Sequence, residues 1–291
     1  MTYVVSHKAA SQCVLGEGPV WCCAKQELLF VDILGKSLYI LGAQQELNKL
    51  SLSQRVSSIA LSRSGELIGA SERGLCWIDR KTGVIDCIGG TPIIPETALM
   101  NDGKCDRQGR FVFGSKALNE MDPVGELLSF VDGKIQSHTQ GIVINGPAFS
   151  PDGKQIYFAD SPSKTIYTAS YHLETGLLGK IEEFVVLPEG AGYPDGVTVD
   201  SEGCLWNAHW DGWRISRYRP NGTLDREIEV PVSKPTSLVF CGEDLQTLFI
   251  TSAKKGRQEA ANSTEKLAGD LFAIEFDVKG IEETLYLGAV H

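Results

Sequence analysis

Oxygen-bearing side chains recur at one position of a pattern that repeats along this chain. Four of them stand eight residues before a turn glycine and two more fit the pattern loosely, which together gives Glu17, Ser57, Asn101, Asn145, Asp195 and Thr236. Two carboxylates and two amides brought into one partly buried place would repel one another unless a positive charge sat between them. Oxygen ligands select a hard divalent cation, namely calcium, magnesium or manganese, with zinc or ferrous iron as alternatives. The pattern therefore indicates one divalent cation as cofactor.

The same repeat predicts the elements that must hold these side chains. Its turn glycines, Gly65, Gly109, Gly153 and Gly203, are 44, 44 and 50 residues apart, and each joins two short apolar runs. A period of about 40–50 residues built from short strands is typical of β-propeller blades. A second strand pair, such as SLYILG or TIYTASYH, follows in each unit. The sequence thus predicts an all-β, six-bladed β-propeller with about four antiparallel strands per blade, as a single domain over residues 1–291. A pair of β-sandwiches is the alternative, and the fixed period argues against it.

In a propeller the first strand of each blade lines the central channel, so equivalent positions converge near one face. Asn-Gly and Asp-Gly pairs also occur as simple turn residues at strand ends. Because the column repeats in register, we favour the metal site over six unrelated turns. No helix of appreciable length is expected, and residues 253–270 are expected to form a long loop or a short helical excursion.

Composition excludes several classes of partner. With 42% apolar and 22% charged residues and a net charge of −10, the chain resembles an ordinary soluble globule, and its acidic balance disfavours nucleic acid. No apolar run approaches the ~20 residues that span a bilayer, and the N-terminus lacks a signal-peptide core, so we expect a cytoplasmic protein without a membrane partner. The eight cysteines form no CxxC pair and are expected to be reduced thiols. Neither a GxSxG nucleophile motif nor an HExxH zinc motif is present.

Four stretches together resemble the regucalcin/gluconolactonase family of six-bladed propellers: LGEGPVW, NDGKCDRQGRFVFG, INGPAFSPDGKQIYFAD and PDGVTVDSEGCLWNAHW. The resemblance runs from about Gly16 to the ITSAKKG stretch. It implies a sugar lactonase that uses one divalent cation held by Glu17, Asn145 and Asp195. It also implies that Asn101 contacts the substrate or a metal-bound water.

One position departs from the family. Many members carry an arginine two residues before the NDG asparagine, where this chain has Leu99. Lys116, Glu120 and His209 are candidates to contact the substrate in its place. Ordinary solvated roles for Lys116 and Glu120, and a bland position at the channel rim for His209, remain open alternatives. One of the tryptophans is expected to form an apolar wall of the site: Trp21, Trp206, Trp210 or Trp213.

These residues suggest a hydrolytic mechanism. A divalent cation polarises the lactone carbonyl, and Asp195 acts as the general base toward water. Two other functions stay open at this point. One is hydrolysis of other esters or phosphotriesters, and the other is a calcium-binding regulatory propeller that uses its faces to bind proteins.

Overall fold

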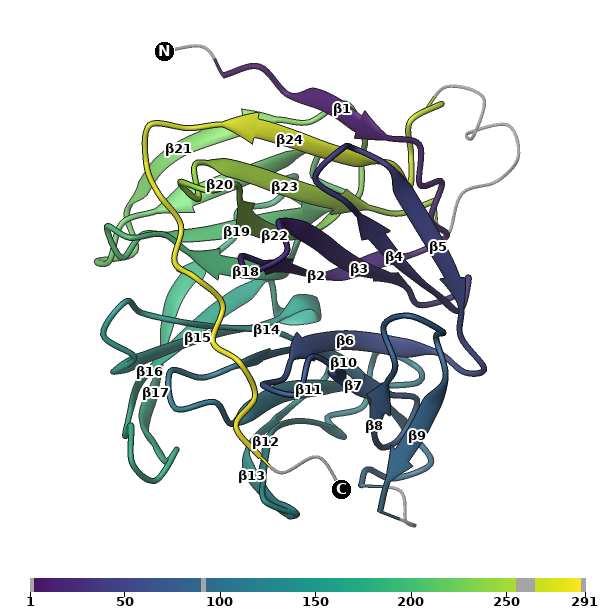
Figure 1. The fold of residues 1–291 in the computed structure, drawn as a ribbon. Coiled ribbons are helices and arrows are strands. Elements are labelled where there is room, and N and C mark those ends of the chain that lie inside the picture. Colours follow the sequence, from purple (N-terminus) through teal and green to yellow (C-terminus); the bar gives the residue numbers. More distant parts are fainter. Residues whose placement is uncertain (1–2, 90–92, 255–264, 289–291) are drawn as a thin grey trace.

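The computed structural model describes residues 3–89, 93–254 and 265–288. Six four-stranded antiparallel sheets follow one another around a central axis, as Figure 1 shows. This arrangement confirms the predicted six-bladed β-propeller. In five blades the strands run in chain order from the axis to the rim, and in the sixth the N-terminal strand is the outermost.

The first three blades are built from the first half of the chain. Blade 1 contains β2 (Gly16–Cys22), β3 (Glu27–Asp32), β4 (Ser37–Leu41) and β5 (Leu47–Ser51). Blade 2 contains β6 (Val56–Leu61), β7 (Leu67–Ser71), β8 (Leu75–Ile78) and β9 (Ile85–Ile88). Blade 3 contains β10 (Ala98–Cys105), β11 (Phe111–Ala117), β12 (Gly125–Val131) and β13 (Lys134–Gly141).

The remaining blades complete the ring. Blade 4 contains β14 (Ile144–Phe149), β15 (Gln155–Asp160), β16 (Thr165–Tyr171) and β17 (Leu178–Val186), with the short 3₁₀ helix η1 (Ser161–Ser163) between β15 and β16. Blade 5 contains β18 (Tyr193–Val199), β19 (Leu205–Trp210), β20 (Arg214–Tyr218) and β21 (Leu224–Glu229). Blade 6 contains β22 (Pro235–Cys241), β23 (Thr247–Ser252), β24 (Leu271–Glu275) and, as its outermost strand, β1 (Ser6–Ala9).

Blade 6 therefore combines the two ends of the chain. Strand β1 pairs antiparallel with β24, with Ser6 opposite Ala273. A side-chain bond reinforces this pairing, because Ser6 Oγ donates to the carbonyl of Ala273 at 3.0 Å. The ring is thus closed by contacts between segments that are distant in the sequence. This pairing stabilises the ring because opening it exposes an unpaired strand edge.

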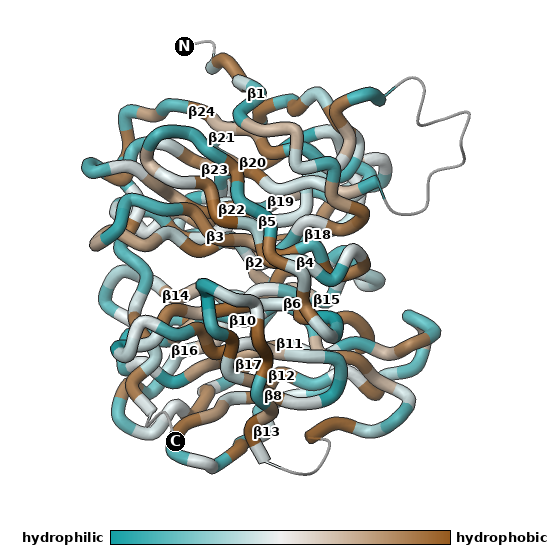
Figure 2. Tube along the Cα trace, turned by 45° about the vertical axis from the view of Figure 1, so that its right-hand side comes forward, coloured by the Kyte–Doolittle hydropathy of each residue, from teal (hydrophilic) through white to brown (hydrophobic). Residues whose placement is uncertain are grey.

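The core lies between the blades. Among the described residues, buried apolar side chains form six clusters, one at each interface between neighbouring blades, including the interface between blades 6 and 1. Strands that are buried on both faces, such as β2, β6, β14 and β22, contribute to two interfaces. In Figure 2 hydrophobic segments recur along the strands, whereas many turns at the periphery are hydrophilic.

A C-terminal strap, defined here as residues 276–288, crosses one end of the channel. It is hydrogen-bonded to the end of one inner strand and to the turn after another: Tyr286 N donates to Leu61 O at 2.7 Å, and Leu287 N donates to Gly109 O at 3.0 Å. Glu283 of the strap forms an ion pair with Lys104 at 2.7 Å. The strap is the yellow trace that descends across the ring in Figure 1. It covers the end of the channel at which the inner strands finish, and this leaves the opposite end for a site.

The described residues contain no helix longer than η1, as expected, and none that is long and apolar enough to cross a membrane. Of the predicted loop over 253–270, residues 255–264 lie outside the described residues. All eight cysteines are free thiols, and six of them are buried, in agreement with the sequence.

Candidate active site

A one-residue register shift occurs at the same place in every inner strand. The shifts fall between Glu17 and Val20, Val56 and Ser58, Met100 and Gly103, Asn145 and Ala148, Pro194 and Val197, and Pro235 and Leu238. Each column residue lies at or within one of these shifts. A β-bulge bends its strand and re-aims the adjacent side chain. The bulges thus explain how side chains near the start of a core strand turn toward the axis.

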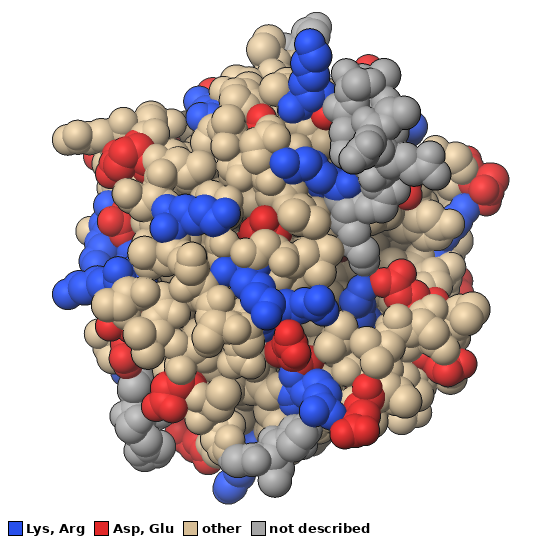
Figure 3. All heavy atoms as spheres, turned by 90° about the vertical axis from the view of Figure 1, so that its right-hand side faces the viewer, with Lys and Arg blue, Asp and Glu red and all other residues tan. Residues whose placement is uncertain are grey.

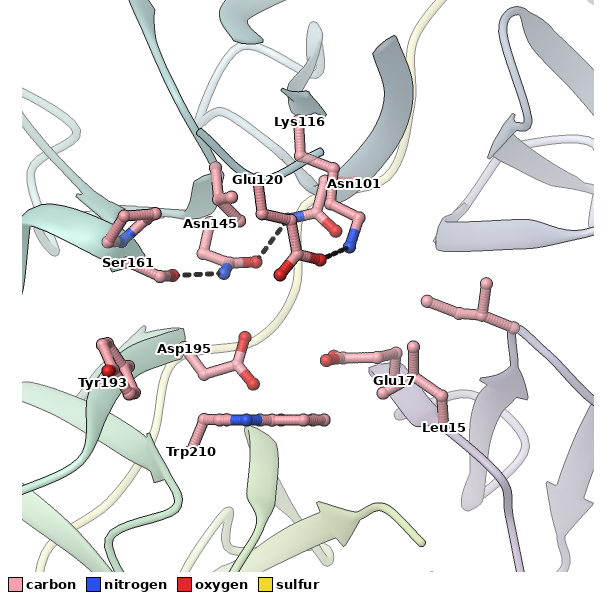
Figure 4. Close-up of a pocket in the computed structure, with 13 residues that line it drawn as sticks. Leu15, Glu17, Asn101, Lys116, Glu120, Asn145, Ser161, Tyr193, Asp195 and Trp210 are labelled. Atoms are coloured by element: carbon pink, nitrogen blue, oxygen red, sulfur yellow. Dashed lines mark hydrogen bonds and ion pairs between the residues drawn. The ribbon is translucent and has the colours of Figure 1, made fainter. Parts of the chain in front are cut away.

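Four of the six column residues line one pocket of about 390 Å³, namely Glu17, Asn101, Asn145 and Asp195. Glu17, Asn145 and Asp195 are each only 6% exposed. In Figure 4 the carboxylates of Glu17 and Asp195 point toward each other across the pocket, and the amide of Asn145 lies beside them. The structure therefore brings together the three side chains expected to hold a metal ion.

The other two column residues bind backbone instead. Ser57 Oγ donates to Asn101 O at 2.8 Å, and Thr236 Oγ1 donates to Gly16 O at 2.5 Å. Neither lines the pocket. The sequence predicted that all six column residues place an oxygen at one point. In the structure four of them do so, while the hydroxyls of Ser57 and Thr236 bind the backbone of the neighbouring blade.

A hydrogen-bond relay orients Asn145. Its Nδ2 donates to Ser161 Oγ at 2.8 Å, and Ser161 Oγ donates to Pro194 O at 2.7 Å. Asn101 Nδ2 donates to Asn145 Oδ1 at 2.6 Å. Because the nitrogen of the Asn145 amide is engaged by Ser161, its oxygen faces Asn101 and the pocket. Ser161 thereby links the side chain of Asn145 to the strand that carries Asp195.

The electrostatics of the pocket favour a cation. Burial raises the pKa of Glu17 well above its ordinary value, and the nearby carboxylates of Asp195 and Asp102 raise it further. Burial also raises the pKa of Asp102 to about 7, against the opposing effect of a hydrogen bond from Gly146 N and the charge of Lys104. Two facing carboxylates with an oriented amide oxygen form a hard, all-oxygen donor set that suits a divalent cation. No group of three or more His, Cys, Asp or Glu residues suited to a metal occurs among the described residues. The donor set of this pocket contains two carboxylates, and its third member is the amide of Asn145.

The wall of the pocket contains the expected Lys116 and Glu120. Lys116 Nζ lies 2.6 Å from Glu120 Oε1, and the Lys116 side chain is 19% exposed. Lys116 is also directly opposite Leu99 in the pairing of β10 and β11. Opposite residues of an antiparallel pair project from the same face of the sheet. Lys116 therefore places a positively charged ammonium group next to Leu99, the position at which many family members carry an arginine.

His209 lies elsewhere. It is fully buried, and it is absent from the pocket lining. Its Nδ1 is 2.8 Å from Ala191 O, and burial lowers its pKa to about 4. The sequence predicted His209 near the channel mouth, as a substrate contact or as a residue of the rim, because it comes just after the inner strand of the fifth unit. The alternation along β19 instead turns it into the interface with blade 4, behind the pocket wall.

Three positions in or beside the pocket were not expected from the sequence, or were expected only in part. Ser161 directly follows Asp160, the last residue of β15, and it belongs to none of the motifs recognised in the sequence. Asp102 belongs to the NDG motif beside Asn101, and the sequence analysis gave it no role of its own. Trp210 lines the pocket and is the member of the tryptophan set that forms its wall, together with the apolar side chains of Leu15 and Ile33. Sequence alone could have pointed to Asp102, since it neighbours a column residue, but not to Ser161, whose role depends on blade 5.

The pocket opens on the face at which the inner strands begin, which is the face seen in Figure 3. Basic and acidic side chains are interspersed over this face. Two lysines stand over aromatic rings that line the pocket, Lys234 over Trp210 at 4.3 Å and Lys164 over Tyr193 at 5.5 Å. The surface around the mouth is therefore mixed in charge rather than uniformly basic.

A family model described as "SMP-30/Gluconolactonase/LRE-like region" matches residues 15–254. The chain belongs to this family. The matched range contains all the pocket residues named above and agrees closely with the range of resemblance found in the sequence.

Two related lactonases and one solved structure match this chain over nearly its whole length. A 6-deoxy-6-sulfogluconolactonase of Pseudomonas putida is 34% identical over 281 residues, covering 94% of this chain and 96% of the relative. The pentonolactonase XacC of Haloferax volcanii is 31% identical over 288 residues, covering 96% and 97%. The crystal structure of a calcium-binding protein, regucalcin, from Agrobacterium tumefaciens superposes with a TM-score of 0.93 at 27% identity, covering 98% of both chains. These likenesses confirm the prediction of a lactonase-type enzyme within the regucalcin/gluconolactonase family.

Proposed function

We propose that this protein is a divalent-metal-dependent hydrolase that opens a sugar lactone, an aldonolactone, to the sugar acid. The observation that supports the proposal most directly is the facing pair of buried carboxylates, Glu17 and Asp195, with the oriented amide oxygen of Asn145 beside them. Relatives named as lactonases of both hexose-derived and pentose sugars support the substrate class.

In this proposal Glu17, Asn145 and Asp195 hold the cation. When bound there, the cation supplies Lewis acidity toward the lactone carbonyl and lowers the pKa of water. Its identity is open among calcium, zinc, manganese, magnesium and iron. The similarity to regucalcin, a calcium-binding protein, makes calcium the first ion to test.

Asp195 is the proposed general base. It accepts a proton from the attacking water as the water oxygen bonds to the carbonyl carbon. The bond from that carbon to the ring oxygen then breaks, and the proton held by Asp195 passes to the departing ring oxygen, which becomes a hydroxyl. Water is the only co-reactant, and the product is the open-chain hydroxy acid.

Asn101 and the Lys116–Glu120 pair are the proposed substrate contacts. Asn101 lines the pocket, and its amide nitrogen is already engaged by Asn145 and Ile144 O, so its own amide oxygen is the atom left to face substrate or water. Lys116 and Glu120 present a donor and an acceptor together, a combination suited to adjacent sugar hydroxyls. Trp210 offers a flat apolar surface to the carbon face of a sugar ring.

The test is a lactone screen in weakly buffered pH indicator. Purified protein is stripped with chelator and assayed against a panel of five- and six-membered aldonolactones, with each candidate cation returned separately. Acid release that depends on lactone and is restored by a cation is the expected result. Full turnover by the stripped protein would remove the metal from the mechanism.

A calcium-binding propeller without hydrolytic activity is the second candidate, favoured by the similarity to the calcium-binding regucalcin structure. It predicts calcium binding at the same three residues but no acid release from any lactone in the panel. The same preparations, titrated with calcium by calorimetry, distinguish the two functions. Simple esters and a phosphotriester in the panel test the remaining hydrolase alternative.

A further inference from the structure

A buried polar cluster lies between blades 4 and 5, outside the pocket. Leu205, Asn207 and His209 are two residues apart on β19, so their side chains lie on the same face of the strand. Leu205 belongs to the apolar cluster between blades 4 and 5, which shows that this face points toward blade 4. Asn207 and His209 are both fully buried there. The interface thus contains an amide and an imidazole where apolar side chains would pack.

Three atoms of these two side chains have no hydrogen-bond partner among the described residues: Asn207 Oδ1, Asn207 Nδ2 and His209 Nε2. His209 Nδ1 is 2.8 Å from Ala191 O. A carbonyl oxygen only accepts, so Nδ1 carries the proton, and Nε2 of the neutral ring is a bare acceptor. Buried polar atoms are nearly always satisfied by protein or by ordered water. The unpartnered atoms therefore point to a small hydrogen-bonding ligand held inside the interface.

The spacing of the two residues suits a water molecule. Residues two apart on a strand are separated by about 6.6 Å along its axis. Two hydrogen bonds through one water span roughly 5.5–6 Å. A water between them can donate to His209 Nε2 and accept from Asn207 Nδ2. The buried hydroxyl of Ser216, which is directly opposite Asn207 on β20, is a further polar group beside this position.

His209 also contacts the segment that leads to Asp195. Ala191, whose carbonyl it binds, lies between Gly190 and Gly192, both with a φ of +80°. Glycines at such φ values leave a segment with little stiffness of its own. The next residues, Tyr193 and Asp195 on β18, line the pocket, and Pro194 is directly opposite His209. The bond to Ala191 is therefore a fixed point just before the strand that carries the proposed base.

We propose that His209 is a positioning residue for Asp195, and that it acts with a buried water bound between its Nε2 and Asn207. The neutral ring holds the carbonyl of Ala191 through Nδ1, and the water holds the ring in place through Nε2. The effect on turnover rests on the proposed function. The ordering of residues 187–195 and the presence of the water do not.

Hydrogen exchange of the metal-free protein tests the positioning role. In His209→Leu we expect amides in residues 187–196 to exchange about tenfold faster or more, with the other blades unchanged. The matched control is His138→Leu, which removes a histidine hydrogen-bonded to Ser129 Oγ at 2.9 Å in blade 3. His209→Gln, which retains a donor for Ala191 O, should recover part of the protection. Unchanged exchange of 187–196 in His209→Leu, or the same acceleration in His138→Leu, would overturn the proposal.

Manganese titration of the stripped protein adds a readout of the site itself. We expect the manganese Kd of His209→Leu to rise about tenfold, the size of effect typical of residues that orient metal ligands. A manganese Kd equal to that of His138→Leu would count against positioning of Asp195. Should His209→Leu fail to fold, the comparison of His209→Gln with wild type in both experiments serves instead, with smaller changes in the same direction expected.

The water has its own test. A high-resolution crystal structure of the wild-type protein should show one ordered water within hydrogen-bond distance of His209 Nε2 and Asn207, and Asn207→Leu should lose it and exchange faster over 187–196. An interface without that water refutes this part. If the wild-type protein opens no lactone while the exchange results hold, the proposed function fails and the positioning role stands.

Discussion

Replacing Ser161 by alanine tests whether the relay behind Asn145 controls metal affinity. Ser161 Oγ accepts from Asn145 Nδ2 at 2.8 Å and donates to Pro194 O at 2.7 Å. Ser161→Ala removes both bonds, which leaves the Asn145 amide held by Asn101 but without its acceptor at Nδ2, and loosens the backbone just before Asp195. The hydroxyl lines the pocket and contacts both Asn145 and the carbonyl of Pro194, so the change tests its effect on two proposed ligands.

The magnitude follows from the two lost bonds. Each is worth about 0.5–1.5 kcal/mol net, so the site loses about 1–3 kcal/mol of preorganisation. Every 1.4 kcal/mol is a tenfold change in affinity, which places the expected rise in metal Kd at roughly 5- to 150-fold. This range overlaps the 10- to 100-fold cost usual for partners of metal ligands.

The assay is calorimetric titration of stripped protein with calcium and manganese, followed by lactonase rates as a function of metal concentration. Ser163→Ala is the matched control, because Ser163 lies in the same 3₁₀ turn and its Oγ donates to Asp160 O at 2.8 Å, away from the pocket. We expect Ser161→Ala to need more metal while its rate at saturating metal stays near that of Ser163→Ala. Equal metal affinity in the two variants would refute the relay.

Four further predictions concern the pocket. Asp195→Asn should lower kcat by about 10²- to 10⁴-fold at saturating metal, measured from initial rates, and a near wild-type rate would remove Asp195 as base. Glu17→Gln should raise the metal Kd by about tenfold or more and recover much of its rate when metal is added in excess, so a rate that excess metal does not restore contradicts a purely ligating role. Lys116→Ala should raise KM more than it lowers kcat, and adding Leu99→Arg should restore KM, because the two positions are directly opposite; no rescue would mean that the two side chains reach different places. The raised pKa of Asp102, from an ordinary 3.8 to about 7, makes the metal-free protein lose stability as pH rises through that interval, by up to about 4 kcal/mol, and denaturant titrations should show this fall flattened in Asp102→Asn.

Much of the fold follows from local sequence. Turn glycines 44 residues apart and the apolar runs beside them specify strands and tight turns within each blade, because those contacts involve neighbours along the chain. Equivalent positions of equivalent blades must then lie at equivalent places around the axis. For this reason the sequence predicted that the six column residues share one place, and four of them, Glu17, Asn101, Asn145 and Asp195, line the pocket.

Other features depend on how blades meet. The pairing of β1 with β24 joins distant segments of the chain. The four residues of β1, Ser6–Ala9, do not by themselves predict that this segment is the outermost strand of blade 6. Ser57 belongs to the repeat as fully as Asp195 does, and Thr236 fits it as loosely as Glu17 does, yet Ser57 and Thr236 bind the backbone of the next blade. Which oxygen reaches the pocket is decided by the contacts that each side chain makes with the neighbouring blade, and the repeat pattern does not encode these contacts.

The sequence by itself determined the ring of six blades, because periodic strands are a property of the chain read in order. It also predicted a shared polar column, from which the family resemblance selected Glu17, Asn145 and Asp195 as the proposed ligands. Only the tertiary structure decided that Ser161 orients Asn145, that Lys116 stands opposite Leu99, and that His209 lies behind the pocket wall. Each of these depends on side-chain direction across a strand or blade interface, where a shift of one residue reverses the face that a side chain occupies.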